Sequence, residues 1–323
     1  MTRPVCCLHL AGLVLLTVGC APPSGPADEA GSTGGASEET GASEATGTPL
    51  QCEPFAPYEL DIDAQPNGLY WHRDLSTLFI ADDDNNRILT RTADGAGAVF
   101  AEIPNPTGDP GNDGLGQLDI AADGTVYVPR FGFDDPTLGG VFRISPTGEV
   151  SKIEGLAPDV RRVGLDYDDA SGVLYVATFS KDSEGVFVGW VAAVDPETGS
   201  ETTIIDGFIK PVGILALGGK LYVGDQLGRK LYSVDLANPA LTLLSDEVAA
   251  LDQFTHSDSD DSFFALDFDE PNETGYVYRV DLDGSFTIAA QGAWEPRGIA
   301  FDGQSSVFVS EYDVNRIAVV PAC

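Results

Sequence analysis

The sequence contains an internal repeat, and this repeat restricts the fold more than any other feature. In each copy an aromatic residue stands between apolar residues and is followed by polar turn residues. Successive copies are 48, 48, 47, 42 and 44 residues apart. A period of about 45 residues is typical of four-stranded propeller blades and is longer than most solenoid repeats. The sequence therefore predicts a six-bladed β-propeller over residues 52–323, with six central aromatics: Phe79, Tyr127, Tyr175, Tyr222, Phe264 and Phe308.

The pattern within each copy indicates four antiparallel strands. Several copies open with a glycine followed by apolar residues, as at Gly68 and Gly298. The stretch 275–281 alternates between apolar and polar residues, and the pair Asp283-Gly284 follows it. Alternation with a period of two and an Asp-Gly pair are typical of β-hairpins. We therefore expect an all-β protein, in which 246–251 is the one stretch whose pattern fits a helix.

The last copy is too short to form a complete blade, because the chain ends after the strand-like stretch 315–320. Another strand-like stretch, 58–62, precedes the first complete copy. A ring whose last blade takes its outer strand from the N-terminal side has few exposed strand edges. We therefore predict that 58–62 closes the sixth blade. Two stacked β-sandwiches with a coincidental period are the alternative fold.

The first 19 residues have the features of a secretory signal. Arg3 precedes an apolar run over 5–18, which is too short to cross a bilayer as a helix. The end of this run, 16–20, resembles the bacterial lipobox, and the resemblance implies that Cys20 is acylated after residues 1–19 are removed. The rule for such lipoproteins, applied to Ala21, implies an outer-membrane or cell-surface location. An ordinary signal cleaved nearby is the alternative.

Residues 20–51 have the composition of a flexible linker. The stretch 21–50 is rich in Gly, Ser, Thr, Ala and Pro, and it has five acidic residues, no aromatic residue and no Lys or Arg. Such a segment cannot bury enough apolar surface to offset the entropy of ordering the chain. We therefore expect a disordered, acidic tether between the lipid and the propeller.

The cysteines fit this arrangement. Cys6 and Cys7 would leave with the signal and Cys20 would carry lipid, so Cys52 and Cys323 would remain, at the two ends of the predicted propeller. An extracytoplasmic compartment favours disulfides. We therefore predict a bond between these two cysteines.

The charge of the chain excludes some classes of partner. With 51 acidic and 17 basic residues the formal charge is −34. Nucleic-acid binding and docking to anionic lipid both need clustered Lys and Arg, so we expect neither. Membrane association would depend on the lipid anchor alone. We expect a monomer whose partner is a small molecule or a cell-envelope protein.

Two stretches resemble NHL repeats. One contains 67–68, 79–82 and 86–88, and the other contains 295–302, 307–311 and 315–317. The same blade pattern is similar to the gluconolactonase/regucalcin-like family of six-bladed propellers. That resemblance implies a divalent cation at one mouth of the central channel, held by Glu, Asn and Asp, with a further Asn and Arg orienting a sugar lactone.

The residues of this chain match that ligand set only in part. Among the residues that precede inner-strand glycines, Val163 and Val212 cannot coordinate a cation. Asn112-Asp113-Gly114 matches the family's Asn-Asp-Gly, although Pro110 stands where the family has Arg. The sequence therefore favours a binding module over an enzyme. A metal-dependent lactonase or esterase with a diverged site remains the alternative.

Candidate ligand-binding residues at the channel mouth are Asn67, Asn112, Asp113, His256 and Arg297. Arg297 would orient an anionic or carbonyl-bearing ligand. A structural ion pair is the alternative role for it. No motif for a catalytic nucleophile or a zinc site identifies catalytic residues.

Carboxylates follow the first aromatic strand and suggest a metal site. Asp82 and Asp84 lie in the run 82–84, and with Asp113 they are candidate ligands for Ca²⁺ or another divalent cation. The spacing differs from that of an EF-hand loop, and solvated turns are the alternative interpretation. No other cofactor is indicated. We interpret the chain as a lipid-anchored, extracytoplasmic binding module that uses the loops at one face of a propeller.

Overall fold

The structure is a computed structural model that describes residues 58–59, 64–92, 95–105, 114–132, 138–248, 250–257, 261–269 and 274–321. The signal, the linker, Cys20, Cys52, Cys323 and the pair Asn112-Asp113 lie outside the described residues. In the part that is described, no helix is long and apolar enough to cross a membrane.

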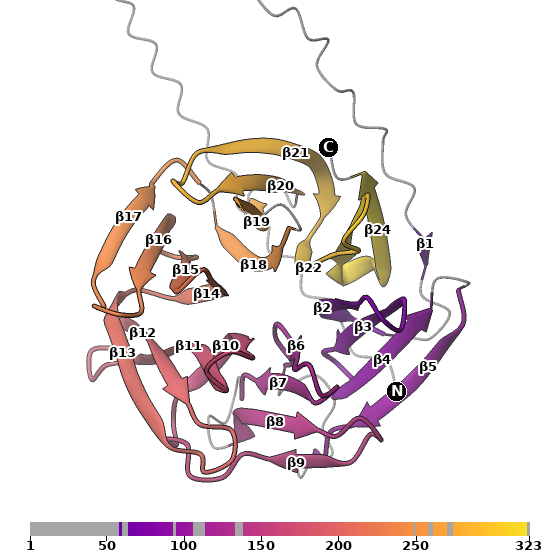
Figure 1. The fold of residues 1–323 in the computed structure, drawn as a ribbon, viewed down its shortest axis with the longest axis horizontal. Coiled ribbons are helices and arrows are strands. Elements are labelled where there is room, and N and C mark those ends of the chain that lie inside the picture. Colours follow the sequence, from indigo (N-terminus) through magenta and orange to yellow (C-terminus); the bar gives the residue numbers. More distant parts are fainter. Residues whose placement is uncertain are drawn as a thin grey trace, which may run out of the picture. The chain divides into compact units, whose positions relative to one another are not determined.

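The propeller consists of six four-stranded sheets, or blades, arranged around a central axis (Figure 1). All neighbouring strands within a blade are antiparallel, as predicted from the hairpin pattern. Blade I consists of β2 (Pro66–His72), β3 (Thr77–Asp82), β4 (Arg87–Thr92) and β5 (Gly97–Glu102). Blade II consists of β6 (Asp119–Ile120), β7 (Val126–Arg130), β8 (Gly140–Ile144) and β9 (Val150–Lys152). Blade III consists of β10 (Arg161–Asp168), β11 (Val173–Lys181), β12 (Phe187–Val194) and β13 (Glu201–Phe208). Blade IV consists of β14 (Pro211–Leu217), β15 (Lys220–Asp225), β16 (Lys230–Asp235) and β17 (Leu241–Ser245). Blade V consists of β18 (Leu251–His256), β19 (Ser262–Asp269), β20 (Thr274–Asp281) and β21 (Phe286–Trp294). Blade VI consists of β22 (Pro296–Phe301), β23 (Ser306–Glu311), β24 (Arg316–Pro321) and β1 (Tyr58–Glu59).

Blade VI closes the ring in the predicted manner. Its strand order is β1-β24-β23-β22, so the outermost strand comes from the N-terminal side of the domain. Tyr58 pairs with Ile317 and Glu59 pairs with Arg316. On the inner side, the buried Ser310 hydroxyl donates to the Asn67 carbonyl oxygen of blade I at 3.0 Å. The predicted closure is therefore confirmed.

The hydrophobic core lies between the blades. Six clusters of buried side chains each combine residues from two neighbouring blades. All six predicted central aromatics lie on the second strand of their blade, where they contribute to these clusters. This arrangement excludes the sandwich alternative, because each sheet buries both of its faces against other blades. The predicted helix at 246–251 is wrong for its described residues, since β17 ends at Ser245 and β18 begins at Leu251.

Inner-strand glycines allow the blades to meet closely around the axis. A methyl group on Gly164 would lie 2.0 Å from the Val212 carbonyl oxygen of the next blade. The corresponding distance from Gly298 to the Asn67 oxygen is 1.8 Å. At these glycines the pairing of the first two strands also shifts register, as between Pro66 and Leu69. Such bulges redirect side chains, and here they lie beside the channel.

Candidate functional site

The central channel has a cavity at each end. Mouth 1 lies where the inner strands begin, and mouth 2 lies where they end. Mouth 1 is a cavity of about 260 Å³ that receives side chains from all six blades. Its wall contains Asn67, Asp83, Phe131, Val163, Phe179, Lys210, Val212, Gln226, Asp252, Gln253, Arg297 and Tyr312.

Arg297 is the most prominent charged group of mouth 1. It is the second residue of β22, directly before the glycine that packs on blade I. Its Nη1 lies 3.7 Å from Asp252 Oδ2, and its guanidinium carbon lies 4.6 Å from the centre of the Phe268 ring. The Tyr312 ring lies 5.5 Å from the same carbon. An arginine placed against two rings keeps a fixed orientation while its remaining N–H groups can still donate.

Asp252 is a buried carboxylate whose negative charge is attracted by two cations, Arg297 and Lys210. Its Oδ2 accepts a hydrogen bond from Gln226 Nε2 at 3.4 Å, and the Gln226 oxygen accepts one from Lys210 Nζ at 2.6 Å. Burial raises the pKa of Asp252 to about 6, although Arg297 and Lys210 act in the opposite direction. The carboxyl therefore titrates close to neutral pH, as general acids and bases in clefts do.

A second carboxyl of mouth 1 behaves similarly. Asp83 Oδ2 accepts a hydrogen bond from the Tyr312 hydroxyl at 2.5 Å, and Oδ1 accepts one from the Leu115 backbone N–H at 2.7 Å. Burial raises the pKa of Asp83 to about 6, against the effect of these two donors. Burial also raises the pKa of Tyr312, so that its hydroxyl stays protonated and donates to Asp83.

The floor of mouth 1 is made of amides. Gln253 Nε2 donates to Asn67 Oδ1 at 3.2 Å and so connects blade V to blade I. Gln253 is 2% exposed, and its Oε1 is buried with no hydrogen-bond partner among the described residues. A buried amide oxygen without a donor is costly, so this atom favours an occupant that carries N–H or O–H groups.

The structure brings two of the predicted ligand-binding residues together and separates a third. Asn67 and Arg297 both line mouth 1. His256, at the end of β18, lines mouth 2 instead, because an inner strand runs the length of the channel from one mouth to the other. Asn112 and Asp113 lie outside the described residues.

Two of the three predicted metal ligands, Asp82 and Asp84, lie in the described part of the chain. Asp82 is fully buried and accepts hydrogen bonds from the Gln65 backbone N–H at 2.9 Å and from Arg87 Nε at 2.5 Å. Its carboxylate thus stabilises the turn after β3, whereas Asp84 in the same turn is exposed. Since Asp113 is outside the described residues, the cation site on these three residues stays a prediction.

The described residues of mouth 1 do not fit a divalent cation. Val163 and Val212 have no side-chain atoms that can coordinate a metal ion. The Asp252 carboxylate could do so, but the Arg297 guanidinium lies beside it. The Asn67 side-chain oxygen is already used by Gln253. Across the described ranges, no three His, Cys, Asp or Glu side chains are close enough to hold a metal ion. A hard cation would therefore meet apolar side chains at Val163 and Val212 and a competing positive charge at Arg297.

Asp252 escaped the sequence analysis because blade V lacks the inner-strand glycine. A methyl group on Gly213 would lie 2.2 Å from the Asp252 carbonyl oxygen, so Asp252 occupies the place that Val212 has in blade IV. Gln253 stands where the other blades have glycine. The aromatic repeat could have identified the position, since Asp252 precedes Phe264 by the same 12 residues that separate Asn67 from Phe79. Asp83 and Tyr312 gave no comparable signal, because each directly follows a second strand in a polar loop.

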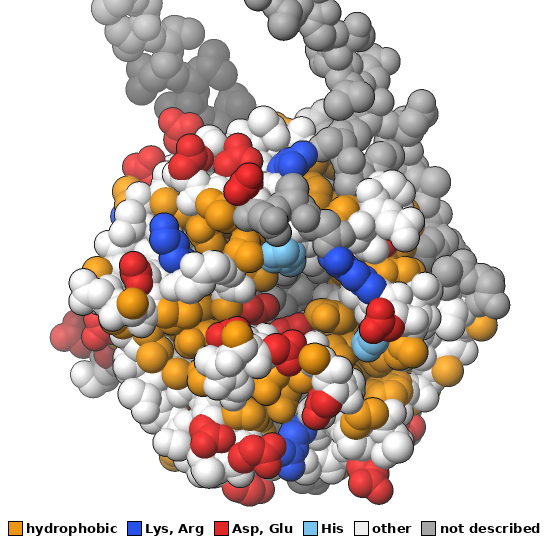
Figure 2. All heavy atoms as spheres, in the orientation of Figure 1, with side chains coloured by type: hydrophobic (Ala, Val, Ile, Leu, Met, Phe, Trp, Pro, Cys, Tyr) orange, Lys and Arg blue, Asp and Glu red, His pale blue; other side chains and the backbone are white. Residues whose placement is uncertain are grey.

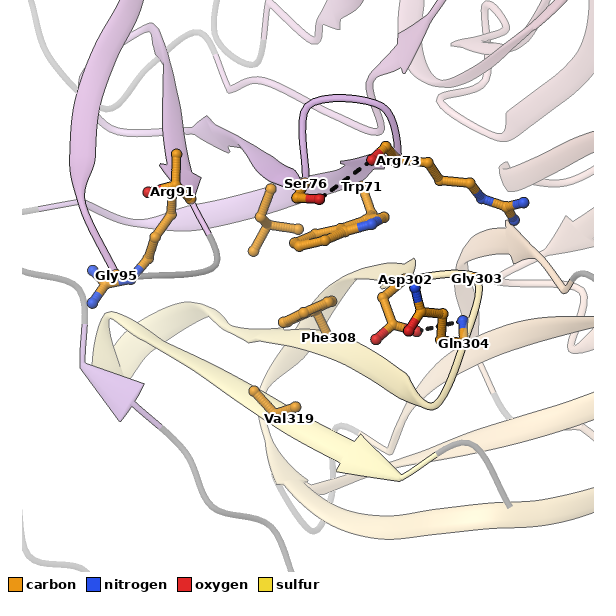
Figure 3. A pocket seen from close by; sticks show the side chains of 12 residues that line it. Trp71, Arg73, Ser76, Arg91, Gly95, Asp302, Gly303, Gln304, Phe308 and Val319 are labelled. Carbon is orange, nitrogen blue, oxygen red and sulfur yellow. Dashed lines mark hydrogen bonds between the residues drawn. The ribbon is translucent and has the colours of Figure 1, made fainter.

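A separate cleft of about 580 Å³ lies at the junction of blades VI and I (Figure 3). Trp71 and Phe308 face each other across it, with ring centres 5.1 Å apart and planes inclined by 13°. In Figure 3 the Arg73 side chain extends away from this pair. The stacked rings join blade I to blade VI, so we assign the cleft a role in ring closure.

No family model and no curated protein matches the sequence of this chain. Solved structures do match its fold. A gluconolactonase from Xanthomonas campestris superposes with a TM-score of 0.63 at 14% identity, over 84% of this chain and 95% of that one. The calcium-binding protein regucalcin from Agrobacterium tumefaciens gives 0.61 at 17% identity, over 83% and 94%. Virginiamycin B lyase from Staphylococcus aureus gives 0.57 at 16% identity, over 84% and 99%.

These similarities define the class of the protein, which is an all-β, six-bladed propeller of the shape shared by gluconolactonase/regucalcin-like proteins and related propellers. The predicted resemblance is thus confirmed at the level of the fold. At these identities the likeness extends no further than the fold, which serves both enzymes and binding proteins.

Proposed function

We propose that this chain is a binding module that holds a small polar molecule in mouth 1. The observation that carries the proposal is the fixed Arg297 guanidinium between Asp252 and the Phe268 and Tyr312 rings. A guanidinium in this setting donates in one direction and selects a carbonyl or carboxylate oxygen.

The remaining groups of mouth 1 define the other side of the ligand. Lys210 adds a second cation to the wall, and the Gln253 amide oxygen requires a donor. Phe131 and Phe179 supply apolar surface beside these polar groups. A compact ligand with a carbonyl or carboxylate at one end and hydroxyl groups at the other can accept from the cations and donate to the Gln253 oxygen. Sugar acids and sugar lactones have this composition.

The alternative function is hydrolysis of a lactone or a similar ester in the same mouth. One observation favours it: Asp252 and Asp83 both have a pKa of about 6 and lie in a cavity that also contains Arg297. Carboxyls of this kind can accept or donate a proton near neutral pH. A similar solved structure is named as a gluconolactonase. A metal-dependent form of this reaction would need ligands that the described part of mouth 1 does not supply.

Calorimetry with D-gluconate and a hydrolysis assay with glucono-1,5-lactone separate the two functions. We expect saturable gluconate binding that Arg297→Met weakens at least about tenfold, the value of one charge-assisted hydrogen bond. Arg143→Met is the matched control, because Arg143 also pairs with a single carboxylate, Glu197, but lies outside mouth 1. Lactone should disappear at the rate seen in buffer alone.

Three results would contradict the binding proposal. Lactone turnover that exceeds the buffer rate and is lost in Asp252→Asn would establish the hydrolase instead. Turnover that depends on added Ca²⁺, Mg²⁺, Mn²⁺ or Zn²⁺ would restore the metal-dependent alternative. Equal loss of gluconate binding in Arg297→Met and Arg143→Met would show that the contact is unspecific attraction.

We further propose that the propeller works at the cell envelope, tethered through a lipid on Cys20 and the linker 20–51. The lipobox-like sequence and the composition of the linker support this location. Fractionation of cells that express the full chain tests it. Wild-type protein should sediment with membranes and Cys20→Ala should move to the soluble fraction, whereas identical fractionation of both would refute the anchor.

A further inference from the structure

Mouth 2 is a second polar cavity, of about 240 Å³, and its wall is rich in negatively charged side chains. Asp119 of β6, Asp166 of β10 and Asp169 all line it. In Figure 2, acidic side chains lie on one side of the hollow at the centre of the ring, and a histidine lies on the opposite side. No residue proposed for ligand binding in mouth 1 belongs to this wall.

The backbone holds the carboxylates of mouth 2 in place. Asp119 accepts hydrogen bonds from the backbone N–H groups of Ile120 at 2.8 Å and Tyr167 at 2.6 Å. Asp166 accepts one from the Ala216 N–H at 2.7 Å. These donors come from the chain itself, so they fix the carboxylates without neutralising them. The site is therefore preorganised before any ligand arrives.

Gln117 gives an independent indication that mouth 2 receives a hydrogen-bond donor. This residue of blade II is 4% exposed, and its Nε2 donates to the Ile214 carbonyl oxygen of blade IV at 3.1 Å. Its Oε1 is buried without a partner in the described structure, and Gln117 is part of the cavity wall. An amide oxygen can only accept, so the occupant that satisfies it must bring an N–H or O–H group.

The charged and titratable groups around mouth 2 leave an excess of negative charge. Three carboxylates stand against one guanidinium, that of Arg73, and His256 is the other basic side chain of the wall. Tyr70 and Tyr167 add two phenols. Burial raises the pKa of Asp119 to about 6, and burial together with the Asp119 charge raises the pKa of Asp166. A bound cation would relieve both effects.

The spacing of these groups selects an organic cation over a metal ion. Among the described residues no three acidic, His or Cys side chains are close enough to share one metal. The wall also contains aromatic rings, including Trp71 and Phe254, which suit the methylene groups of an organic cation. We propose that mouth 2 binds a small organic cation with primary ammonium groups, which donate to the carboxylates and to Gln117 Oε1.

Putrescine, a diamine, is the probe for this proposal, and Trp71 provides a fluorescence signal because it lines the cavity. At constant ionic strength and pH 8 we expect saturable binding with a dissociation constant below about 1 mM. Asp166→Asn should weaken it about tenfold. Asp169→Asn gives a second reading if the first variant fails to fold, because Asp169 is exposed and an Asn oxygen can still accept the hydrogen bond from the Ala122 backbone N–H. Asp195→Asn is the matched control, since Asp195 is an exposed turn carboxylate of the same blade outside mouth 2.

The pH and a neutral analogue complete the test. Binding should weaken as the pH falls from 8 to 5, because Asp119 and Asp166, whose pKa values are raised, become protonated. The isosteric diol 1,4-butanediol should not bind. Absence of saturation by 10 mM putrescine, an equal response to the diol, or equal weakening in Asp195→Asn and in the mouth 2 variants would each overturn the proposal.

Discussion

The buried carboxyls of mouth 1 predict an unusual dependence of stability on pH. Asp83 and Asp252 both have a folded-state pKa of about 6, against an ordinary value of 3.8. A carboxyl whose pKa is raised by folding binds its proton more tightly in the folded state than in the unfolded state. Its stabilising effect is complete at low pH and is lost as the pH rises from about 4 through 6.

The magnitude follows from the size of the shift. A change from 3.8 to about 6 corresponds to about 3 kcal/mol for each carboxyl once the pH is well above 6. Roughly half of this loss falls between pH 5 and pH 7.5, so the two groups together should lower the free energy of unfolding by about 3 kcal/mol over that interval. Asp119 and Asp166 in mouth 2 act in the same direction.

Urea unfolding at pH 5 and pH 7.5, at constant ionic strength, measures this difference. We expect the wild-type propeller to be more stable at pH 5. Asp252→Asn should remove about half of the part that mouth 1 contributes, because Asn cannot ionise but still accepts from Gln226. Asp195→Asn removes one equally negative side chain from an exposed turn and should leave the difference unchanged. Higher stability at pH 7.5, or an unchanged difference in Asp252→Asn, would refute the reasoning.

Three further predictions concern the stability of the ring. Arg162→Met should lower the free energy of unfolding by about 3 to 5 kcal/mol, because it leaves the mostly buried Glu201 without its partner at 2.8 Å, and adding Glu201→Met should recover much of the loss in urea titrations. Gly164→Ala should cost about 3 kcal/mol or more, since its methyl group would overlap the backbone of the next blade, and an unchanged melting temperature would contradict the close packing of the blades. If Cys52 and Cys323 are bonded, alkylation of the unfolded, unreduced protein followed by mass spectrometry should label neither, and two labelled thiols would exclude the bond.

The architecture could be predicted from the sequence because repetition multiplies a weak local signal. A single stretch such as the one around Phe79 is compatible with several folds. Six copies at a nearly constant spacing indicate one structural unit used six times. The closure was predictable for a related reason: a missing strand at one end and a spare strand at the other match only in a ring.

Mouth 1 was less predictable, because its residues come from positions with different local signals. Asn67 and Arg297 precede glycines that the close approach of the blades requires, and the sequence analysis found both. Asp252 has no such glycine beside it. The sequence analysis grouped His256 with these residues at one mouth, but it did not show that β18 carries His256 to the opposite mouth.

Two glutamines bridge blades beside the two mouths of the channel. Gln253 takes the place of an inner-strand glycine in blade V and reaches Asn67, while Gln117 reaches across to the Ile214 carbonyl of blade IV. Each amide uses its N–H group to bridge blades, and its oxygen is buried without a hydrogen-bond partner among the described residues. A glycine at either position would remove a bridge and an acceptor together. Because the two mouths share no lining residue, we expect the ligands proposed for them to bind independently at the two ends of the ring.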